Sequence, residues 1–357
     1  MQRHIDNYNL EVFRLSKRKQ TSISLEKSIN NDPSFLKWTD RLKESLEDSV
    51  SLEFDTSKIR PALYRPFVRK HLYFDHLLNQ RRYQQHRIFP VNIEIGENLA
   101  IALTTLGSEK PFMSLAVSSV CDLHLVGAGS GAQCFPYYVY DEDASNRREN
   151  ITDWALQHFR EHYQDKKLTK WDVFYYVYGI LHHPEYRTKF ADNLKRELPR
   201  IPLAPDFKAF SKAGKELAKL HLDYEKLKPW PLKWIETEGE PLSYHVEKMR
   251  LSKDKTELKV NESLTLAKIP PEVFEYRLGN RSALDWVIDQ YRVKTDKRSG
   301  ITSDPNNPDD EQYIVRLVGQ VVRVSVETVK IVNSLPANYG GADAKPKRKA
   351  TPKKKKA

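Results

Sequence analysis

Cysteine is scarce in this chain, and long apolar runs are missing. The 357 residues include only two cysteines, Cys121 and Cys134, which are too few for a disulfide framework and are not spaced like metal ligands. No stretch approaches the roughly 18 consecutive apolar residues of a membrane-spanning helix, and the N-terminal segment lacks the apolar part of a secretory signal peptide. We therefore expect a globular protein of the reducing cytoplasm, with no membrane segment.

The positive charge is concentrated at the C-terminal end. The formal net charge is +11, and the last thirteen residues supply +8 of it, which leaves 11 − 8 = +3 for residues 1–344. Residues 337–357 offer only Ala and Pro as apolar residues after Tyr339, which predicts a disordered basic tail. Such a tail binds polyanions without sequence preference, or only keeps the protein in solution. Its basic residues are Lys345, Lys347, Arg348, Lys349, Lys353, Lys354, Lys355 and Lys356.

The spacing of apolar residues predicts an α+β fold, with a small, mostly antiparallel β-rich lobe at residues 59–140. Short apolar segments separated by Gly, Asn, Ser and Pro are typical of such a sheet. The expected strands are residues 91–95, 99–105, 113–117, 121–126 and 135–140. Residues 1–58 carry few apolar positions and one candidate amphipathic helix at 34–49, so we expect a linker or the trailing segment of a preceding unit.

Three glycines follow an apolar segment at Gly127, Gly129 and Gly131, as in loops that bind dinucleotides or S-adenosylmethionine. Such a site also needs a helix that begins at the glycines and an acidic residue after the next strand. Here the glycines lead into the aromatic segment 133–140, which contains Pro136. We therefore expect a hairpin connection and no bound cofactor. The alternative is an S-adenosylmethionine-dependent DNA methyltransferase that uses the Gly127–Gly131 loop.

Helical periodicity dominates residues 150–225 and predicts a central helical bundle segment. Thr169 and Asp172 have the spacing of a capping box, and the helix after them is apolar on nearly all sides, as expected for a buried helix. Further helices are expected at residues 184–194 and 207–224. His182 and His183 lie where two helices meet. Because adjacent side chains point in different directions, they indicate a helix end and no metal site.

Residues 240–335 predict a β-hairpin plus helices, which we expect to form a DNA-recognition lobe. Segments 244–251 and 257–260 flank a polar turn, and 261–266 extends the sheet. Residues 298–310 are expected to be a polar loop. A helix at 312–333, apolar along one side, should close the domain.

The segment 269–292 combines a turn, a helix start and several basic groups. Gly279 and Asn280 form a turn pair, and Ser282 with Asp285 predicts a capping box. Free N–H groups and the dipole at a helix start favour phosphate. The alternative is an ordinary capped helix followed by solvated basic residues. The candidates for base or phosphate contact are Asn280, Arg281, Ser282, Arg292, Lys294, Lys297 and Arg298.

A second basic region, residues 59–90, interleaves aromatic residues with Arg and Lys. This pattern can stack on bases and clamp a nucleic-acid backbone. Alternatively, aromatic residues such as Tyr64, Phe67, Tyr73 and Phe74 belong to the core while the basic groups face water. The candidate backbone contacts are Arg69, Lys70, Arg81, Arg82 and Arg87.

In this order, the segments resemble the C-terminal specificity region of the single-polypeptide Type ISP restriction-modification enzymes. The resemblance covers about residues 59–336 and rests on YRPF at 64–67, DLHLVG at 122–127, FYYVYGILHHPEYRTKF at 174–190 and IPPEVFEYRLGNRSALDWVIDQYR at 269–292. Residues 1–58 resemble the end of the family's methyltransferase region. The glycine triplet and the lysine-rich tail depart from the family pattern.

The resemblance implies recognition of a target sequence in double-stranded DNA on behalf of an adenine-N6 methyltransferase and translocase. S-adenosylmethionine, ATP and Mg²⁺ are implied only for domains upstream in the family. This sequence has no Asn-Pro-Pro-Tyr, Walker A, DEAD-type or convincing nuclease motif, so we expect no catalysis by the chain alone. Two other interpretations are a docking module of a split restriction enzyme and an inactive remnant of one.

Overall fold

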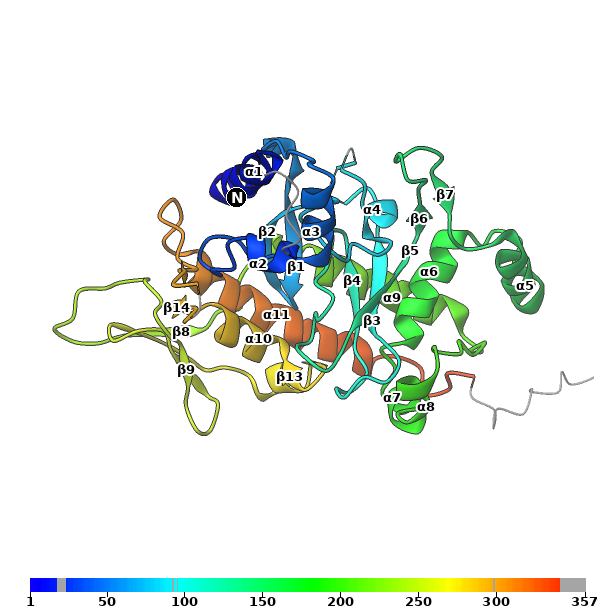
Figure 1. Cartoon of the computed structure of the whole chain (residues 1–357). Coiled ribbons are helices and arrows are strands. Elements are labelled where there is room, and N and C mark those ends of the chain that lie inside the picture. The colour runs from blue at the N-terminus through cyan, green and yellow to red at the C-terminus, as the bar shows by residue number, and fades with distance from the viewer. Residues whose placement is uncertain (18–23, 92, 95, 298, 341–357) are drawn as a thin grey trace, which may run out of the picture.

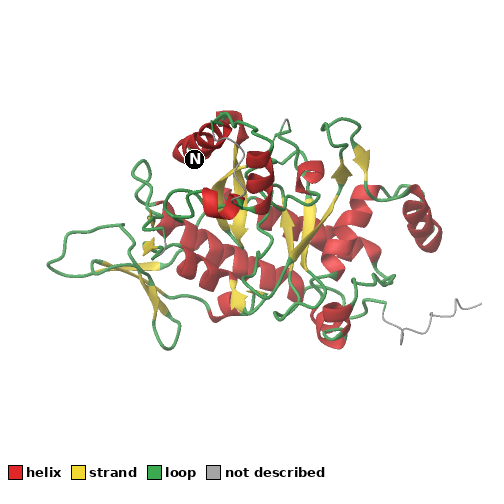
Figure 2. Cartoon of the chain, viewed as in Figure 1, coloured by secondary structure: helices red, strands yellow, loops and turns green. Residues whose placement is uncertain are grey.

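The computed structural model describes residues 1–17, 24–91, 93–94, 96–297 and 299–340. Helices and small sheets are distributed along an elongated body (Figures 1 and 2). All paired strands in the described ranges are antiparallel, and the predicted α+β class is confirmed. No described helix combines the length and the apolar character needed to cross a membrane.

The N-terminal region is helical and contains α1 (Gln2–Ser16), α2 (Leu25–Ser28) and α3 (Asp40–Glu47). The helix predicted over 34–49 is shorter at both ends, because the Thr39 hydroxyl accepts a hydrogen bond from the Leu42 amide and begins α3 there. The three helices share an apolar cluster that also includes Tyr73 and Leu77 from the following region. The N-terminal helices therefore pack on the body through these two residues.

A hairpin that the sequence patterns did not predict comes next, and its elements are η1 (Thr56–Lys58), β1 (Ile59–Arg65) and β2 (Val68–Tyr73). Phe67 in its turn has φ of 59° and is only 1% exposed. Its ring packs edge-on against Tyr224, with 5.1 Å between ring centroids. Tyr73 and Phe74 are also buried, so most aromatic residues of this region are core. The sequence pattern did not predict this hairpin because it contains Pro61 and Pro66, and proline is rare inside paired strands.

Residues 85–149 contain α4 (Gln85–Ile88), β3 (Ala100–Thr104), β4 (Ser114–Val117), β5 (Ala132–Pro136), β6 (Tyr138–Val139) and β7 (Arg148–Glu149). β3 lies between β4 and β5, and the strands predicted at 99–105 and 113–117 are confirmed. The strand predicted at 135–140 is divided at Tyr137. That ring stacks on Trp171, with 3.5 Å between centroids, and so joins the sheet to the helices.

Two predicted strands do not form. Of residues 91–95, those at 91, 93 and 94 are not in a strand, and those at 92 and 95 lie outside the described residues. Residues 121–126 keep a single bridge, between Cys121 and Leu63. The chain then turns, because the Asp122 carboxylate accepts a hydrogen bond from the His124 amide at 2.8 Å. Local hydrogen bonds from short polar side chains compete with strand pairing.

The helical part consists of α5 (Asp153–Tyr163), α6 (Lys170–Ile180), α7 (Pro184–Lys189), α8 (Asn193–Arg196), α9 (Phe207–Leu222) and η2 (Tyr224–Lys226). The capping box of Thr169 and Asp172 is confirmed. The single helix predicted at 184–194 is divided into α7 and α8. Gly179 of α6 and Gly214 of α9 allow the two backbones to cross closely, since a Cβ atom at either glycine would overlap a carbonyl oxygen of the other helix.

The C-terminal part begins with a four-stranded sheet, which is made by β8 (Lys233–Glu236), β9 (Arg250–Leu251), β10 (Glu257–Lys259) and β11 (Leu264–Ala267). It forms an arm at the left of Figure 1. The predicted hairpin is confirmed as the β9–β10 pair, whereas β8 was not predicted. The remaining elements are η3 (Pro271–Phe274), β12 (Arg277–Leu278), β13 (Arg281–Ser282), α10 (Ala283–Gln290), β14 (Lys294–Thr295), β15 (Thr302–Ser303) and α11 (Tyr313–Asn333).

Helix α11, close to the range predicted for it, joins two large apolar clusters. Leu317, Val318 and Val321 are fully buried in the cluster that includes residues of α10, η3 and the β1–β2 hairpin. Ile331 and Val332, near the end of the helix, pack against the second cluster, around α6 and α9. Figure 1 shows α11 running through the body beside α10. The helix thus packs against both clusters, as the β3–β4 pair does with its two faces.

We predict that Gly214→Ala destabilises the fold. Alanine favours helix by about 1 kcal/mol over glycine, but the new Cβ would overlap the backbone oxygen of Tyr175, which cannot rotate away. Overpacking should lower the free energy of unfolding by about 1–3 kcal/mol, measured by urea denaturation. Lys215→Ala, at an exposed position of the same helix, is the control and should stay within about 0.5 kcal/mol. An unchanged or more stable Gly214→Ala variant would contradict the close crossing.

We further predict a pH-dependent loss of stability for Asp75→Asn. Burial alone would raise the pKa of Asp75, but the hydrogen bond from Lys58 and those from the Leu77 and Leu78 amides outweigh it and lower the pKa. A lowered folded-state pKa contributes stability above the unfolded pKa, and this contribution is lost as the pH falls from about 5. The variant should lose about 1.5–3 kcal/mol at pH 7. The urea unfolding midpoints of the unsubstituted chain and of the variant should converge as the pH falls. A difference in midpoint that does not depend on pH would refute the role of the ion pair.

Candidate nucleic-acid interface

The turn before α10 forms as the sequence predicts. β12 and β13 pair across Gly279 and Asn280, and Gly279 has φ of +68°, which glycine tolerates better than other residues. The Ser282 hydroxyl accepts a hydrogen bond from the Asp285 amide at 3.1 Å, while the Asp285 carboxylate accepts one from the Ser282 amide at 3.1 Å. The predicted capping box is confirmed. Trp286 anchors the turn by donating from Nε1 to the Leu278 carbonyl at 3.0 Å.

The capping box removes Ser282 from the residues that a ligand can reach. Its side chain is 0% exposed, and its hydroxyl is already bonded to Asp285. Asn280 is exposed at the tip of the turn, where its carbonyl accepts a hydrogen bond from Arg277. Of Asn280, Arg281 and Ser282, only the first two are therefore accessible to a ligand.

Arg281 and Arg292 share one carboxylate. The Asp289 carboxylate lies 2.6 Å from Arg281 and 3.6 Å from Arg292, and the Arg281 guanidinium lies 4.9 Å from the centroid of the Trp286 ring. Burial alone would raise the pKa of Asp289, but the hydrogen bond and charge of Arg281, with smaller contributions from Gln290 and Arg292, lower it. Both arginines are thus held in place on one side of α10.

Lys294 and Lys297 are exposed on the hairpin of β14 and β15 that follows α10. Lys294 pairs with Ser303 across this hairpin. Arg298, the last candidate of the group, lies outside the described residues. The two lysines therefore project from a short two-stranded hairpin next to the end of α10.

A hollow of about 740 Å³ brings Arg69 and Lys70, from the second predicted basic group, to the end of α10. The described residues that line it include no candidate from the first group. β2 supplies Arg69 and Lys70, and the end of α10 supplies Gln290 and Tyr291. Ser303, the strand partner of Lys294, also belongs to its wall. The hollow thus joins segments more than 200 positions apart in the sequence.

Arg69 is the best-fixed cation of this hollow. It forms an ion pair with Glu225, which also accepts a hydrogen bond from the Tyr313 hydroxyl at 2.9 Å. Lys70 is more exposed, and its ammonium lies 4.8 Å from the centroid of the Tyr64 ring. The hollow is also lined by a segment at residues 303–309 that carries Asp304 and Asp309. Its lining therefore contains both basic and acidic side chains.

Arg81, Arg82 and Arg87 are not part of this hollow. Arg81 and Arg82 line a second hollow, of about 540 Å³, together with both cysteines. The Arg87 guanidinium donates to the Tyr140 carbonyl at 3.1 Å. The predicted backbone contacts are therefore separated: Arg69 and Lys70 line one hollow, Arg81 and Arg82 line another, and Arg87 is in neither lining.

Gln290, Tyr291 and Asn306 line the first hollow but were not predicted. The Asn306 side chain bonds to both backbone groups of Val246, at 2.8 and 2.9 Å, which ties the loop to the arm. The sequence predicted a polar loop at residues 298–310, but nothing in it indicated that this loop would line a hollow together with β2. The local composition was enough to identify the loop, but it could not show that the loop lies near β2.

The glycine segment 127–131 is not a hairpin connection, which corrects the prediction. It connects β4 to β5, and these strands lie on opposite sides of β3. The segment leads into a strand, as expected, and not into a helix. Two hydrogen bonds from the segment that follows β3 hold its backbone in place. The Glu109 amide donates to the Gly129 carbonyl and the Thr105 amide donates to the Gly131 carbonyl, each at 3.0 Å.

The two histidines end a helical segment, as predicted. His183 is the N-cap of α7 and accepts a hydrogen bond from the Tyr186 amide at 3.3 Å. Burial lowers the pKa of His182 to about 3, so its ring is neutral. Among the described residues, no group of three or more His, Cys, Asp or Glu side chains is placed to hold a metal ion.

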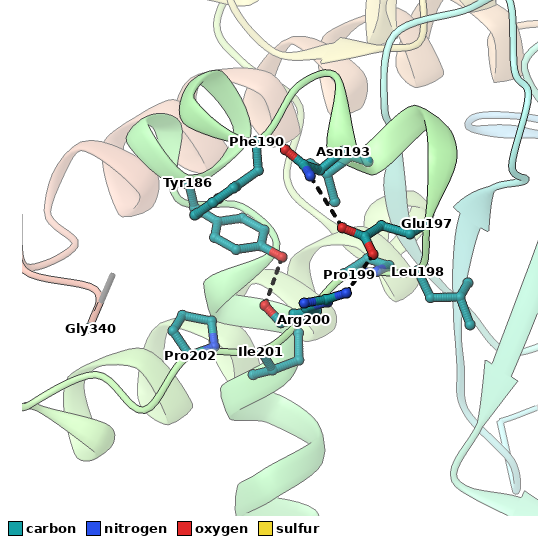
Figure 3. A pocket seen from close by; sticks show the side chains of 11 residues that line it. Tyr186, Phe190, Asn193, Glu197, Leu198, Pro199, Arg200, Ile201, Pro202 and Gly340 are labelled. Carbon is teal, nitrogen blue, oxygen red and sulfur yellow. Dashed lines mark hydrogen bonds and ion pairs between the residues drawn. The ribbon is translucent and has the colours of Figure 1, made fainter. Parts of the chain in front are cut away.

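A third hollow, of about 260 Å³, lies beside α7 and α8 (Figure 3). The Tyr186 hydroxyl donates to the Arg200 carbonyl at 3.0 Å, and Arg200 and Glu197 form an ion pair at 2.8 Å. Asn193 also donates to Glu197, at 3.2 Å. These polar groups thus bond to one another within the lining of the hollow.

Comparison with known proteins gives one consistent result. The family model described as the Type ISP C-terminal specificity domain matches residues 1–317. No curated protein matches the chain. Similar solved structures cover nearly the whole chain. A nuclease-deletion mutant of the Type ISP enzyme LlaGI, in complex with a DNA substrate mimic, has TM-score 0.81 and 34% identity and covers 94% of this chain.

Two further structures agree. The DrdV–DNA complex has TM-score 0.81, 34% identity and 94% coverage of this chain. The ATP-dependent Type ISP enzyme LlaBIII bound to DNA has TM-score 0.82, 31% identity and 95% coverage. The match spans only 30%, 33% and 21% of the LlaGI, DrdV and LlaBIII chains, respectively. With its fold and most of its sequence matched, this chain belongs to the family of Type ISP C-terminal specificity domains.

Proposed function

We propose that this chain recognises a specific sequence in double-stranded DNA and positions an adenine-N6 methyltransferase and a translocase on it. One observation carries the proposal. Arg69 and Lys70 of β2 line the same hollow as the end of α10 and Ser303 of the basic β14–β15 hairpin. That LlaGI, DrdV and LlaBIII were solved with DNA supports the same conclusion. The methyltransferase and translocase, with S-adenosylmethionine, ATP and Mg²⁺, belong to other domains or chains in the cytoplasm.

The proposed contacts divide into two kinds. Lys294, Lys297, Arg69 and Lys70 would bind phosphates, which fixes the orientation of the protein on the duplex without reading sequence. Asn280 and Arg281, at the accessible tip before α10, would contact base edges. Arginine is suited to this task because its planar guanidinium can donate two parallel hydrogen bonds to guanine. Asp289 and Trp286 hold Arg281 before DNA arrives, which reduces the entropy lost on binding.

The proposal is tested by selection from a pool of random duplexes with the full-length chain near physiological salt. A basic tail binds polyanions without sequence preference, so it cannot enrich one sequence. Enrichment of a defined sequence would support target recognition. Equal recovery of all sequences would leave only non-specific binding by basic residues and would refute it.

We predict that Lys294→Ala with Lys297→Ala weakens binding to all duplexes alike. For each lost phosphate contact, the slope of the logarithm of the DNA-binding constant against the logarithm of the salt concentration should fall in magnitude by roughly 1. Fluorescence anisotropy at several salt concentrations measures this slope. The control is Lys166→Ala with Lys167→Ala. These two exposed lysines lie between α5 and α6, at the other end of the molecule from β14 (Figure 1). A slope reduced equally by both pairs would contradict the proposed interface.

We predict a different effect for Arg281→Ala. If Arg281 reads a base, the variant should lose about 1–3 kcal/mol of discrimination at one base pair of the selected sequence and keep most of its non-specific affinity. Arg281→Lys should not restore it, because lysine lacks the planar pair of donors. Repeating the selection with each variant measures this. An unchanged sequence preference would remove Arg281 from base recognition, and an unchanged urea midpoint would exclude unfolding.

A further inference from the structure

The two cysteines, for which the sequence analysis predicted no pairing, are in contact. Their sulfur atoms lie 3.2 Å apart. Cys121 is bridged to Leu63 of β1, and Cys134 belongs to β5. The side-chain amide of Gln85, in α4, lies 3.5 Å from the Cys134 sulfur and 3.9 Å from the Cys121 sulfur. Three separate elements therefore hold the two thiols together.

The pair can be reached from solvent through the hollow of about 540 Å³ that both cysteines line. Arg81 and Arg82 belong to the same wall, and Arg81 is exposed. Within the ranges that the structure describes, neither arginine forms an ion pair with a carboxylate. A small anion would thus approach the sulfur atoms past two positive charges.

The two thiols differ in their readiness to ionise. The hydrogen bond from the Cys121 thiol lowers the pKa of Cys134, and Gln85 acts in the same direction against the effect of burial. The same thiol contact and burial raise the pKa of Cys121. Because the thiolate is the attacking form in thiol–disulfide exchange, Cys134 is the first nucleophile.

We propose that Cys121 and Cys134 are a redox-reactive dithiol site whose reactant is a small anionic disulfide. The Cys134 thiolate attacks one sulfur of the reactant, forms a mixed disulfide and displaces one small thiolate. Cys121 then loses its proton and attacks the Cys134 sulfur, which displaces the second. The two protein thiols give up two electrons and two protons, and the small disulfide is reduced to two thiols.

The new bond would close the loop that supports the turn before α10. This loop, residues 121–134, contains the glycine segment. A Cβ atom built at Gly279 would lie 3.1 Å from Val126 Cβ, and one at Gly127 would lie 3.7 Å from the Trp286 ring. Oxidation would therefore restrain a loop that touches the turn and the first residues of α10.

The test uses the full-length reduced chain with oxidised glutathione, followed by intact mass spectrometry without reductant and by thiol titration. The expected product has lost two hydrogen atoms and carries no adduct, and its titratable thiols fall from two to none and return with dithiothreitol. Cys121→Ser should stop at the mixed disulfide on Cys134, because the second thiol is missing. Unreacted thiols, a stable glutathione adduct on the unsubstituted chain, or a disulfide between two chains would each overturn the proposal.

The role of the two arginines is tested separately. Arg81→Ala with Arg82→Ala should slow the reaction with oxidised glutathione several-fold and leave that with the uncharged hydroxyethyl disulfide unchanged. Equal slowing with both reagents would show that the arginines shape the hollow without attracting the anion, and would overturn the preference for an anionic reactant.

Discussion

Burial of the apolar face of α11 is the interaction on which both halves of this fold depend. A helix of 21 residues extends roughly 30 Å, long enough to touch both large apolar clusters. Its one deeply buried amide, Gln320, is 3% exposed and donates to the carbonyls of Glu225 and Leu227, at 2.6 and 3.0 Å. These bonds satisfy a group that would otherwise be costly to bury, and they fix η2 against α11.

The same contact positions the candidate interface. Glu225 lies in η2, and its carboxylate holds Arg69 and accepts a hydrogen bond from Tyr313 at the start of α11. Tyr313 in turn lies 3.2 Å from the hydroxyl of Tyr291, which follows α10. Arg69 is therefore connected to α11 and to the end of α10 by a chain of polar contacts, which fixes its position before any ligand binds.

The basic residues of the two predicted groups are held in different ways. Arg69 and Arg281 each have a carboxylate partner and an aromatic ring beside them, which fixes their direction but requires a ligand to compete with the carboxylate. Lys294 and Lys297 are exposed on a short hairpin and can follow a phosphate backbone with little reorganisation. A surface that combines held arginines with exposed lysines suits recognition in which orientation and sequence reading are separate tasks.

The amino-acid sequence by itself determined the features that depend on residues a few positions apart. The capping boxes of Thr169 and Ser282, the turn at Gly279 and the apolar stripe of α11 all formed as predicted, because each is decided within one or two helical turns. The family resemblance was likewise carried by short segments in a fixed order. Only the tertiary structure decided which segments meet: Arg69 and Glu225, Lys70 and Tyr291 around one hollow, and Cys121 and Cys134. The first two join positions more than 150 apart along the chain, and all three arise from packing of the whole core, which no local pattern encodes.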